Sequence, residues 1–208
     1  MERKISVAIP HYNNSKFMTD TLTPLLFDKR IDQIIICDDN SKDKEKGSLT
    51  ELIDSLKSDK IIVYYNEENI GSYLNKLLSL SKCSNEWAIL LDSDNIINTD
   101  YIDKLYEIKE WDNTRIFAPD TPVTFPGKPS VNMNYTKYSN TAISKRTYLD
   151  HFGISNFQCL INTCNYFVPV KEYCNCMNKT KDTYKRSEID CLDSAVLFTD
   201  WMLDGNKI

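Results

Sequence analysis

The sequence contains little glycine, proline or histidine, and it has no long apolar run. It has 5 Gly, 7 Pro and 2 His among 208 residues. So few Gly and Pro argue against a collagen-like or low-complexity chain, and a hydrophobic content of 41% argues against disorder. No apolar run approaches the roughly 20 residues that a membrane-spanning helix needs. We therefore expect no transmembrane segment, and any membrane association would be peripheral.

Positive charge is also scarce, because 25 Lys and Arg face 30 Asp and Glu. A net charge of −5 disfavours a surface for nucleic-acid backbones, so we expect no nucleic-acid partner. An acidic protein can still bind a phosphate ligand where a metal ion or a helix N-terminus supplies positive charge.

The 7 cysteines are odd in number and do not form a compact secreted framework. The N-terminus, MERKISVAIP, also has no apolar stretch of signal-peptide length. We expect reduced thiols in a cytoplasmic protein. Cys174 and Cys176 have C-x-C spacing without a paired-His motif, so we do not expect structural zinc.

Short apolar runs alternate with helical patterns in the first half. The predicted strands are 5–9, 31–37, 61–65 and 87–91, and the predicted helices are 15–27, 49–56 and 73–80. Pro10 should end the first strand, and Pro24 should break or kink the first helix near its end. This alternation predicts an α/β fold, with a mostly parallel sheet and helices on both faces.

The second half is less regular. Predicted elements are a helix over 101–108, strands over 114–118, 138–144 and 165–170, a proline-rich loop over 119–129, and a helix over 189–203 that Gly205 ends. No linker or internal repeat is apparent, so we expect one domain.

Carboxylates follow two of the predicted strands. Asp92 and Asp94 come directly after WAILL, and Asp38 and Asp39 follow IDQIIIC. Ligands of parallel sheets bind beyond the carboxyl ends of the strands. Two carboxylates at i and i+2 can approach one hard divalent cation, which can stabilise a leaving phosphate. The same residue types also favour turns and helix caps, so that interpretation stays open.

Four segments resemble the N-terminal half of a family 2 glycosyltransferase with the GT-A (Rossmann-like) fold. They are ISVAIPHYNN, IIICDDNSKD, NEENIGSYLNK and EWAILLDSDN, in the family's order, and they cover about residues 4–105. The resemblance implies a nucleotide-sugar donor, a Mn²⁺ or Mg²⁺ ion and usually inversion at the anomeric carbon. It makes residues 1–105 the nucleotide-sugar half and 106–208 the acceptor half, with a small acceptor-side extension.

Carried over by position, the resemblance assigns a nucleoside site. Pro10 and Tyr12 would line the base pocket, and Asp39 would bind the nucleoside. Asn69 and Gly71 match the family's Asn-x-Gly turn.

The resemblance also assigns a diphosphate and metal site. Lys76 stands where the family often has Arg near the diphosphate. Asp92 would contact ribose or metal-bound water, Ser93 would lie in the same nucleotide-sugar site, and Asp94 would be the direct metal ligand. Two positions depart from the family: His11 replaces a small residue such as Thr, and Leu77 replaces an Asn.

An inverting transfer needs a general base for the acceptor hydroxyl. The family places an acid at the start of a late helix, some dozen residues before a Gly. In EIDCLDSAVLFTDWMLDGNKI, Asp193 has the best spacing and Asp190 is second. Either Asp could instead only cap the helix and offset its dipole.

The sequence therefore predicts a metal-dependent, inverting glycosyltransferase that moves a sugar from a UDP-sugar to a hydroxyl on a glycan, a lipid-linked or a protein-linked acceptor. Two alternatives remain: a nucleotide-sugar-binding domain without turnover, and a nucleotidyltransferase. The chain is expected to be either a minimal enzyme or one domain of a longer protein.

Overall fold

The computed structural model describes residues 3–121, 123–124, 128–129, 136–150, 165–179, 181–182 and 193–208. Its main sheet has the strand order β3-β2-β1-β4-β7. The strands are β1 (Ile5–His11), β2 (Ile31–Asp38), β3 (Ile61–Tyr65), β4 (Trp87–Leu90) and β7 (Tyr166–Pro169). All neighbours are parallel except β7, which runs antiparallel to β4. The predicted α/β fold with a mostly parallel sheet is confirmed.

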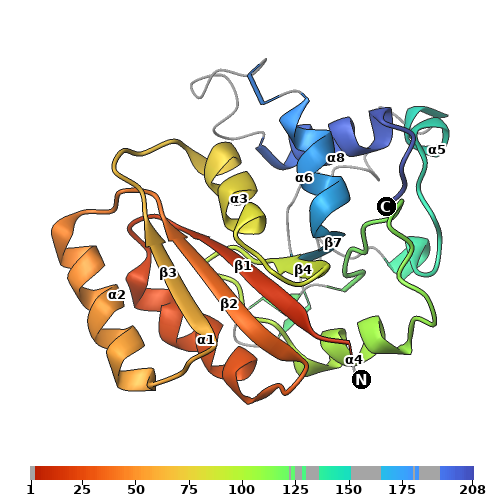
Figure 1. Cartoon of the computed structure of the whole chain (residues 1–208). Helices are drawn as coiled ribbons and strands as arrows, with labels where there is room; N and C mark the ends of the chain where they lie inside the picture. The colour runs from red at the N-terminus through yellow and green to blue at the C-terminus, as the bar shows by residue number, and fades with distance from the viewer. Residues whose placement is uncertain are drawn as a thin grey trace.

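Helices lie on both faces of this sheet (Figure 1). The α-helices are α1 (Met18–Phe27), α2 (Asp43–Leu56), α3 (Ser72–Ser81), α4 (Thr99–Glu107), α5 (Lys145–Asp150), α6 (Val170–Asn178) and α8 (Asp193–Leu203). Short 3₁₀ helices, η1 (Ser15–Phe17) and η3 (Thr136–Tyr138), and a two-stranded pairing of β5 (Val123–Thr124) with β6 (Lys128–Pro129) complete the described elements.

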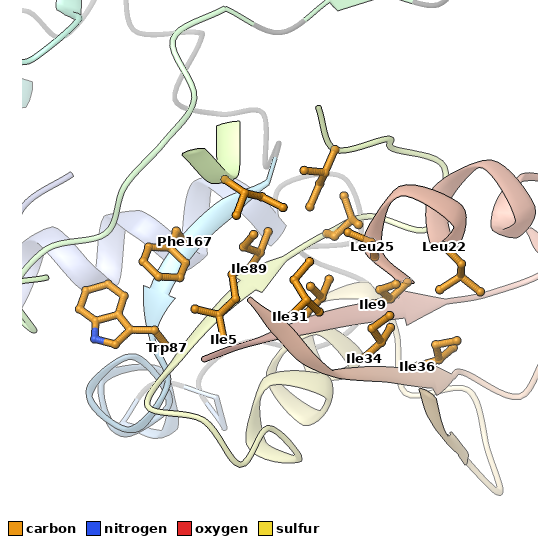
Figure 2. Close-up of a cluster of buried hydrophobic side chains, with 14 of the residues drawn as sticks. Ile5, Ile9, Leu22, Leu25, Ile31, Ile34, Ile36, Trp87, Ile89 and Phe167 are labelled. Atoms are coloured by element: carbon orange, nitrogen blue, oxygen red, sulfur yellow. The ribbon is translucent and has the colours of Figure 1, made fainter. Parts of the chain in front are cut away.

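The two faces of the sheet bury two separate apolar clusters. One cluster packs side chains of α1, α2 and α4 against alternate strand residues, including Val7, Ile36 and Ile89. Figure 2 shows Leu22 and Leu25 of α1 in this cluster, and Trp87 beside Phe167. The other packs α3, α6 and α8 against the opposite side of β1, β4 and β7. Burial on both faces explains why the central strands are continuous apolar runs.

Pro10 does not end β1, so that prediction was wrong. The strand continues to His11, and Pro10 pairs with Cys37 in register. The carbonyl of Ala8 accepts from the Leu91 amide, whereas the carbonyl of His11 accepts from the Asp39 amide. Backbone groups alternate along a strand, so the nitrogen of Pro10 is directed away from β2, toward the side where β4 has already ended. No ladder hydrogen bond is lost there.

The first helix also runs through its proline. After η1, α1 continues past Pro24 to Phe27, so the predicted break is absent. Leu22 and Leu25 are fully buried on either side of Pro24, and this packing offsets the one backbone hydrogen bond that proline removes.

The second half differs more from its prediction. The expected strand over 138–144 is wrong, because η3 ends at Tyr138, α5 begins at Lys145, and between them only Ser144 forms an isolated bridge, with Lys207. The segment 114–118 forms only isolated bridges, Arg115 with Lys207 and Phe117 with Phe167, and the expected loop over 119–129 contains the β5–β6 pairing. The predicted strand near 165–170 and the late helix are confirmed over β7 and α8, and residues 189–192 of the predicted helix lie outside the described residues.

The last described residues hold the described parts of the second half of the chain together. The Lys207 amide donates to the Thr114 carbonyl, and Ile143 and Ile208 exchange two backbone hydrogen bonds. The indole Nε1 of Trp201, in α8, donates to the Lys207 carbonyl at 2.9 Å. Gly205, with φ of 90°, lets the chain reverse after α8, a conformation that disfavours side chains with a Cβ. These bonds anchor the C-terminal end of α8.

Candidate functional site

A cavity of about 420 Å³ lies at the carboxyl ends of β1, β2 and β4, beside the N-terminus of α3. All the residues predicted to bind the nucleotide sugar or the metal line it. Three further residues were not predicted. The full lining is Pro10, His11, Tyr12, Asp39, Asn69, Gly71, Ser72, Asn75, Lys76, Asp92, Ser93 and Asp94. The fold therefore brings the four quoted segments to one edge of the sheet, as parallel strands require.

Asp39 organises the turn that begins α3. Its Oδ1 accepts from the Ile70 amide at 2.8 Å and from Asn66 Nδ2 at 3.0 Å. Its Oδ2 accepts from the Gly71 amide at 2.8 Å. Gly71 has φ of 89°, so this turn requires a residue without a Cβ. The Asn-x-Gly pattern is thus a turn held by a buried carboxylate, and this turn directs the α3 N-terminus toward the cavity.

The turn after β1 is joined to the turn after β2. The Asn13 amide donates to Ser41 Oγ at 2.8 Å, and Asn13 Oδ1 accepts from the Lys42 amide at 2.9 Å. Asn13 has φ of 51°, a region that Asn tolerates better than most residues. These bonds position Tyr12, whose side chain is 52% exposed at the cavity. An exposed aromatic ring on a fixed turn can stack on a flat ligand.

His11 and Asp38 form a buried pair beneath this turn. His11 Nδ1 lies 2.7 Å from Asp38 Oδ1, and both side chains have 0% exposure. Asp38 Oδ2 also accepts from the Ser41 amide at 3.0 Å. Burial raises the pKa of Asp38, but the hydrogen bonds from His11 and Ser41 outweigh it, so the pKa lies below its ordinary 3.8. The sequence marked His11 only as a departure, because nothing local reveals a partner 27 residues away.

Replacing His11 should therefore destabilise the protein. We expect His11→Phe to lower the free energy of unfolding by about 3–5 kcal/mol, because Asp38 stays buried without its imidazole donor. His11→Asn, whose amide can donate near the Nδ1 position, should recover part of the loss. Urea denaturation at pH 7 measures both variants, and a His11→Phe protein as stable as the wild type would contradict the expectation.

The acid dependence of stability gives a second readout of this pair. The pKa of Asp38 is lower in the folded protein, so its contribution is present above pH 3.8 and is lost as the pH falls through the folded-state value. Wild-type stability should therefore fall more steeply below pH 4 than that of His11→Phe.

The segment after β4 is a turn that brings two carboxylates to the cavity lining, one half-buried and one exposed. The Asn95 amide donates to the Asp92 carbonyl, and Ser93 Oγ accepts from Asn14 Nδ2 at 3.2 Å. The Ser93 carbonyl accepts from Thr21 Oγ1 at 3.1 Å. Asp94 is exposed, whereas the Asp92 side chain is 29% exposed. The turn interpretation and the ligand interpretation are thus compatible.

Lys76 reaches this acidic turn from α3. Its Nζ lies 3.1 Å from Asp92 Oδ1, and its side chain is only 7% exposed. The ion pair places a positive charge in the cavity wall beside the two carboxylates of the turn. Such a charge, together with the α3 N-terminus, suits an anionic ligand.

The described residues contain no group of three or more His, Cys, Asp or Glu side chains that could hold a metal ion. Asp92 and Asp94 nevertheless fit Mg²⁺ or Mn²⁺, since such ions commonly use one or two protein carboxylates and take their other ligands from substrate phosphates and water.

Cys37, Cys83, Cys174 and Cys176 are free thiols, as predicted. Burial raises the pKa of Cys37 to about 12, so its thiol is not activated at neutral pH.

The predicted base lies in the less completely described half. Asp193 is the first residue of α8, and Asp190 lies outside the described residues. The helix packs on α6: Trp201 lies 5.4 Å from the Tyr173 ring, and Cys176 Sγ donates to the Asp200 carbonyl. Tyr166 is buried in β7. No helix in the described ranges combines the length and apolarity needed to cross a membrane.

The fold and the cavity define a GT-A protein, and comparisons with solved structures agree. TarS of S. aureus, solved in complex with UDP, aligns with a TM-score of 0.64 at 18% identity over 97% of this chain and 55% of that chain. The mannosyltransferase PcManGT from Pyrobaculum calidifontis aligns with a TM-score of 0.63 at 9% identity, over 100% of this chain and 54% of that one.

The sequence gives the more specific assignment. Residues 6–167 match the model of the family described as Glycosyl transferase family 2, and the chain belongs to that family. It is 29% identical over 118 residues to an uncharacterized glycosyltransferase of Rickettsia felis, covering 56% of this chain and 19% of that protein. It is 27% identical over 108 residues to glycosyltransferase GlyG of Streptococcus pneumoniae serotype 4, covering 51% of this chain and 35% of that protein. The alignments thus span about a third or less of these curated relatives.

Proposed function

We propose that this protein transfers a sugar from a UDP-sugar to a hydroxyl acceptor, with a divalent cation and with inversion at the anomeric carbon. The observation that carries the proposal is the cavity in which the Asp39-held turn, Lys76 and the Asp92–Asp94 turn meet at the carboxyl ends of parallel strands. Membership of Glycosyl transferase family 2 supports it, and is the reason we prefer it to a nucleotidyltransferase.

The donor would lie across this cavity. Tyr12 and Pro10 would contact the base. The Asp39 carboxylate would accept hydrogen bonds from the nucleoside through lone pairs that its bonds to the turn do not use. The TarS structures are described as complexes with UDP and with UDP-GlcNAc, which supports a uridine nucleotide here. Lys76 and the N-terminus of α3 would lie beside the diphosphate, where a positive charge and backbone amides favour an anion.

The cation would bind to Asp94 and Asp92. The PcManGT structure is described as a complex with GDP-Man and Mn²⁺, which supports a divalent ion of that kind. When bound, the cation would stabilise negative charge on the diphosphate. The carboxylates of this chain would hold and orient it, and Ser93, tied to Asn14 and Thr21, would keep the turn in place.

The transfer itself would be a displacement at the anomeric carbon. The acceptor oxygen would form a bond to that carbon while the bond to the diphosphate oxygen breaks, and the diphosphate would leave with the bonding pair. Asp193, or Asp190 as the second candidate, would take the hydroxyl proton. The acceptor would be a glycan, a lipid-linked or a protein-linked hydroxyl, and the buried free thiols favour a cytoplasmic location.

A thermal-shift panel of nucleoside diphosphates and their sugars, with and without Mn²⁺, tests the proposal. A ligand at about 100 times its dissociation constant adds roughly 2.7 kcal/mol to stability. UDP and one UDP-sugar should therefore raise Tm by several degrees, and more with Mn²⁺ present. The UDP-sugar that raises Tm should then be hydrolysed slowly by the protein.

Two outcomes would count against this function. If no nucleotide raised Tm, the cavity would not be a nucleotide site. If UDP-sugars bound but none was hydrolysed or transferred, the alternative of a binding domain without turnover would replace the enzyme.

A further inference from the structure

Lys76 is a buried cation located where a metal ion is expected to bind. Its side chain is 7% exposed, and its Nζ lies 3.1 Å from Asp92 Oδ1. It projects from α3, whose first turn also lines the cavity. The site therefore already contains one positive charge in contact with one of the two carboxylates of the turn.

The cavity's three carboxylates are in different situations. Asp39 accepts hydrogen bonds from the Ile70 and Gly71 amides. Asp92 is paired with Lys76. Asp94 is exposed and also lines the cavity. A cation that enters without a nucleotide would meet Asp94 directly, but it would have to share Asp92 with an ammonium group.

This sharing is unfavourable because like charges repel strongly in a partly buried site, where the effective dielectric constant is lower than in water. A diphosphate changes the balance, since its negative charges attract both cations. The lysine Nζ lies on a flexible four-carbon stem and can move from a carboxylate to a phosphate oxygen. The Asp92 Oδ1 atom that pairs with Lys76 could then face the metal ion or its water.

We propose that Lys76 withholds Asp92 from the divalent cation until a diphosphate enters, so that cation and nucleotide bind cooperatively. This inference rests on the proposed function and adds a rule for the order in which its ligands bind. By linkage, the nucleotide strengthens cation binding by the same factor by which the cation strengthens nucleotide binding. Lys76 is thus a residue that couples the two ligands as well as a phosphate contact.

The test measures Mn²⁺ affinity directly, by the electron paramagnetic resonance signal of free Mn²⁺, with and without UDP. Titrations of Mn²⁺ with UDP in buffer alone correct for the complex that forms in solution. Wild-type protein should bind Mn²⁺ at least about tenfold more tightly when UDP is present, within the usual range of coupling between sites. Equal affinity with and without UDP would overturn the proposal.

Variants of Lys76 test whether this residue couples the binding of Mn²⁺ to the binding of UDP. Lys76→Met keeps most of the stem but removes the charge, so it should bind Mn²⁺ without UDP about tenfold more tightly than wild type and lose most of the coupling. Lys76→Arg keeps the charge and should behave as wild type. Lys104→Met is the matched control, because Lys104 forms an exposed ion pair with Glu107 on α4. Unchanged Mn²⁺ affinity in folded Lys76→Met would overturn the role of Lys76.

Failure of this inference can be distinguished from failure of the proposed function. Calorimetry with UDP alone reports nucleotide binding without any metal. If UDP binds and Mn²⁺ binds independently of it, only the coupling is wrong. If UDP does not bind, with or without Mn²⁺, both the nucleotide site and the coupling are wrong. Should Lys76→Met fail to fold, the wild-type comparison with and without UDP still decides the coupling.

Discussion

Asp94→Ala should lower turnover of the UDP-sugar by about 10³-fold and remove its dependence on Mn²⁺, while leaving the fold intact. The rate loss corresponds to roughly 4 kcal/mol of transition-state stabilisation, a reasonable share for a metal ion at a leaving diphosphate. The fold should survive because Asp94 is exposed on a turn, where substitutions usually change stability by less than about 0.5 kcal/mol. Kinetics over a Mn²⁺ series, with a thermal melt of each protein, measures both effects.

Asp54→Ala is the matched control for that experiment. Asp54 is also an exposed Asp, but it lies near the C-terminal end of α2, whose N-terminal end lies on the cavity side of the sheet. Its loss should leave turnover and the Mn²⁺ requirement unchanged. Full activity in Asp94→Ala would show that the metal assignment is wrong, whereas equal losses in both variants would point to a general effect of net charge.

Asp193→Asn should lower the rate of sugar transfer by about 10²–10⁴-fold and leave the affinity for the donor nearly unchanged. A general base contributes about that factor, because it acts on the proton of the attacking hydroxyl and not on donor binding. The amide has the shape of the carboxylate but cannot take a proton. Release of UDP from the UDP-sugar chosen by the thermal panel measures the rate, and calorimetry with UDP measures the affinity.

Asp190→Asn serves as the paired variant for Asp193→Asn. If Asp190→Asn abolished the release of UDP and Asp193→Asn did not, Asp190 would be the base. If Asp193→Asn instead lost UDP binding, Asp193 would belong to the donor site. A loss of the α8 cap would appear as lower stability without a selective loss of rate, since a helix cap contributes about 1 kcal/mol.

Much of the first half could be predicted from local pattern. The runs at β2 and β4 are apolar because both faces of the sheet are covered, and acidic residues stand at the carboxyl end of each of these strands. Parallel strands have their carboxyl ends at one edge, so Asp39 and Asp92 could be placed together before any coordinates were known, whereas Gly71 was placed only by the resemblance. The resemblance then supplied roles for them, which remain proposals.

The second half could not be predicted as well, because its structure depends on partners far away in sequence. Residues 114–117 are ordered by bridges to Lys207 and Phe167, and Ile143 pairs with Ile208. None of these segments has a strong period of its own. Their backbone groups are satisfied by long-range partners, which no local pattern reveals.

The sequence by itself determined the alternation of strands and helices, the edge at which polar residues gather, and the family. Only the tertiary structure decided which of those residues are partners. It allowed Pro10 to stay in β1, because the neighbouring strand had already ended on that side. It paired His11 with Asp38 and Lys76 with Asp92, because a buried carboxylate or ammonium group needs a hydrogen-bonding or oppositely charged partner, and the sheet register and the position of α3 bring these partners together.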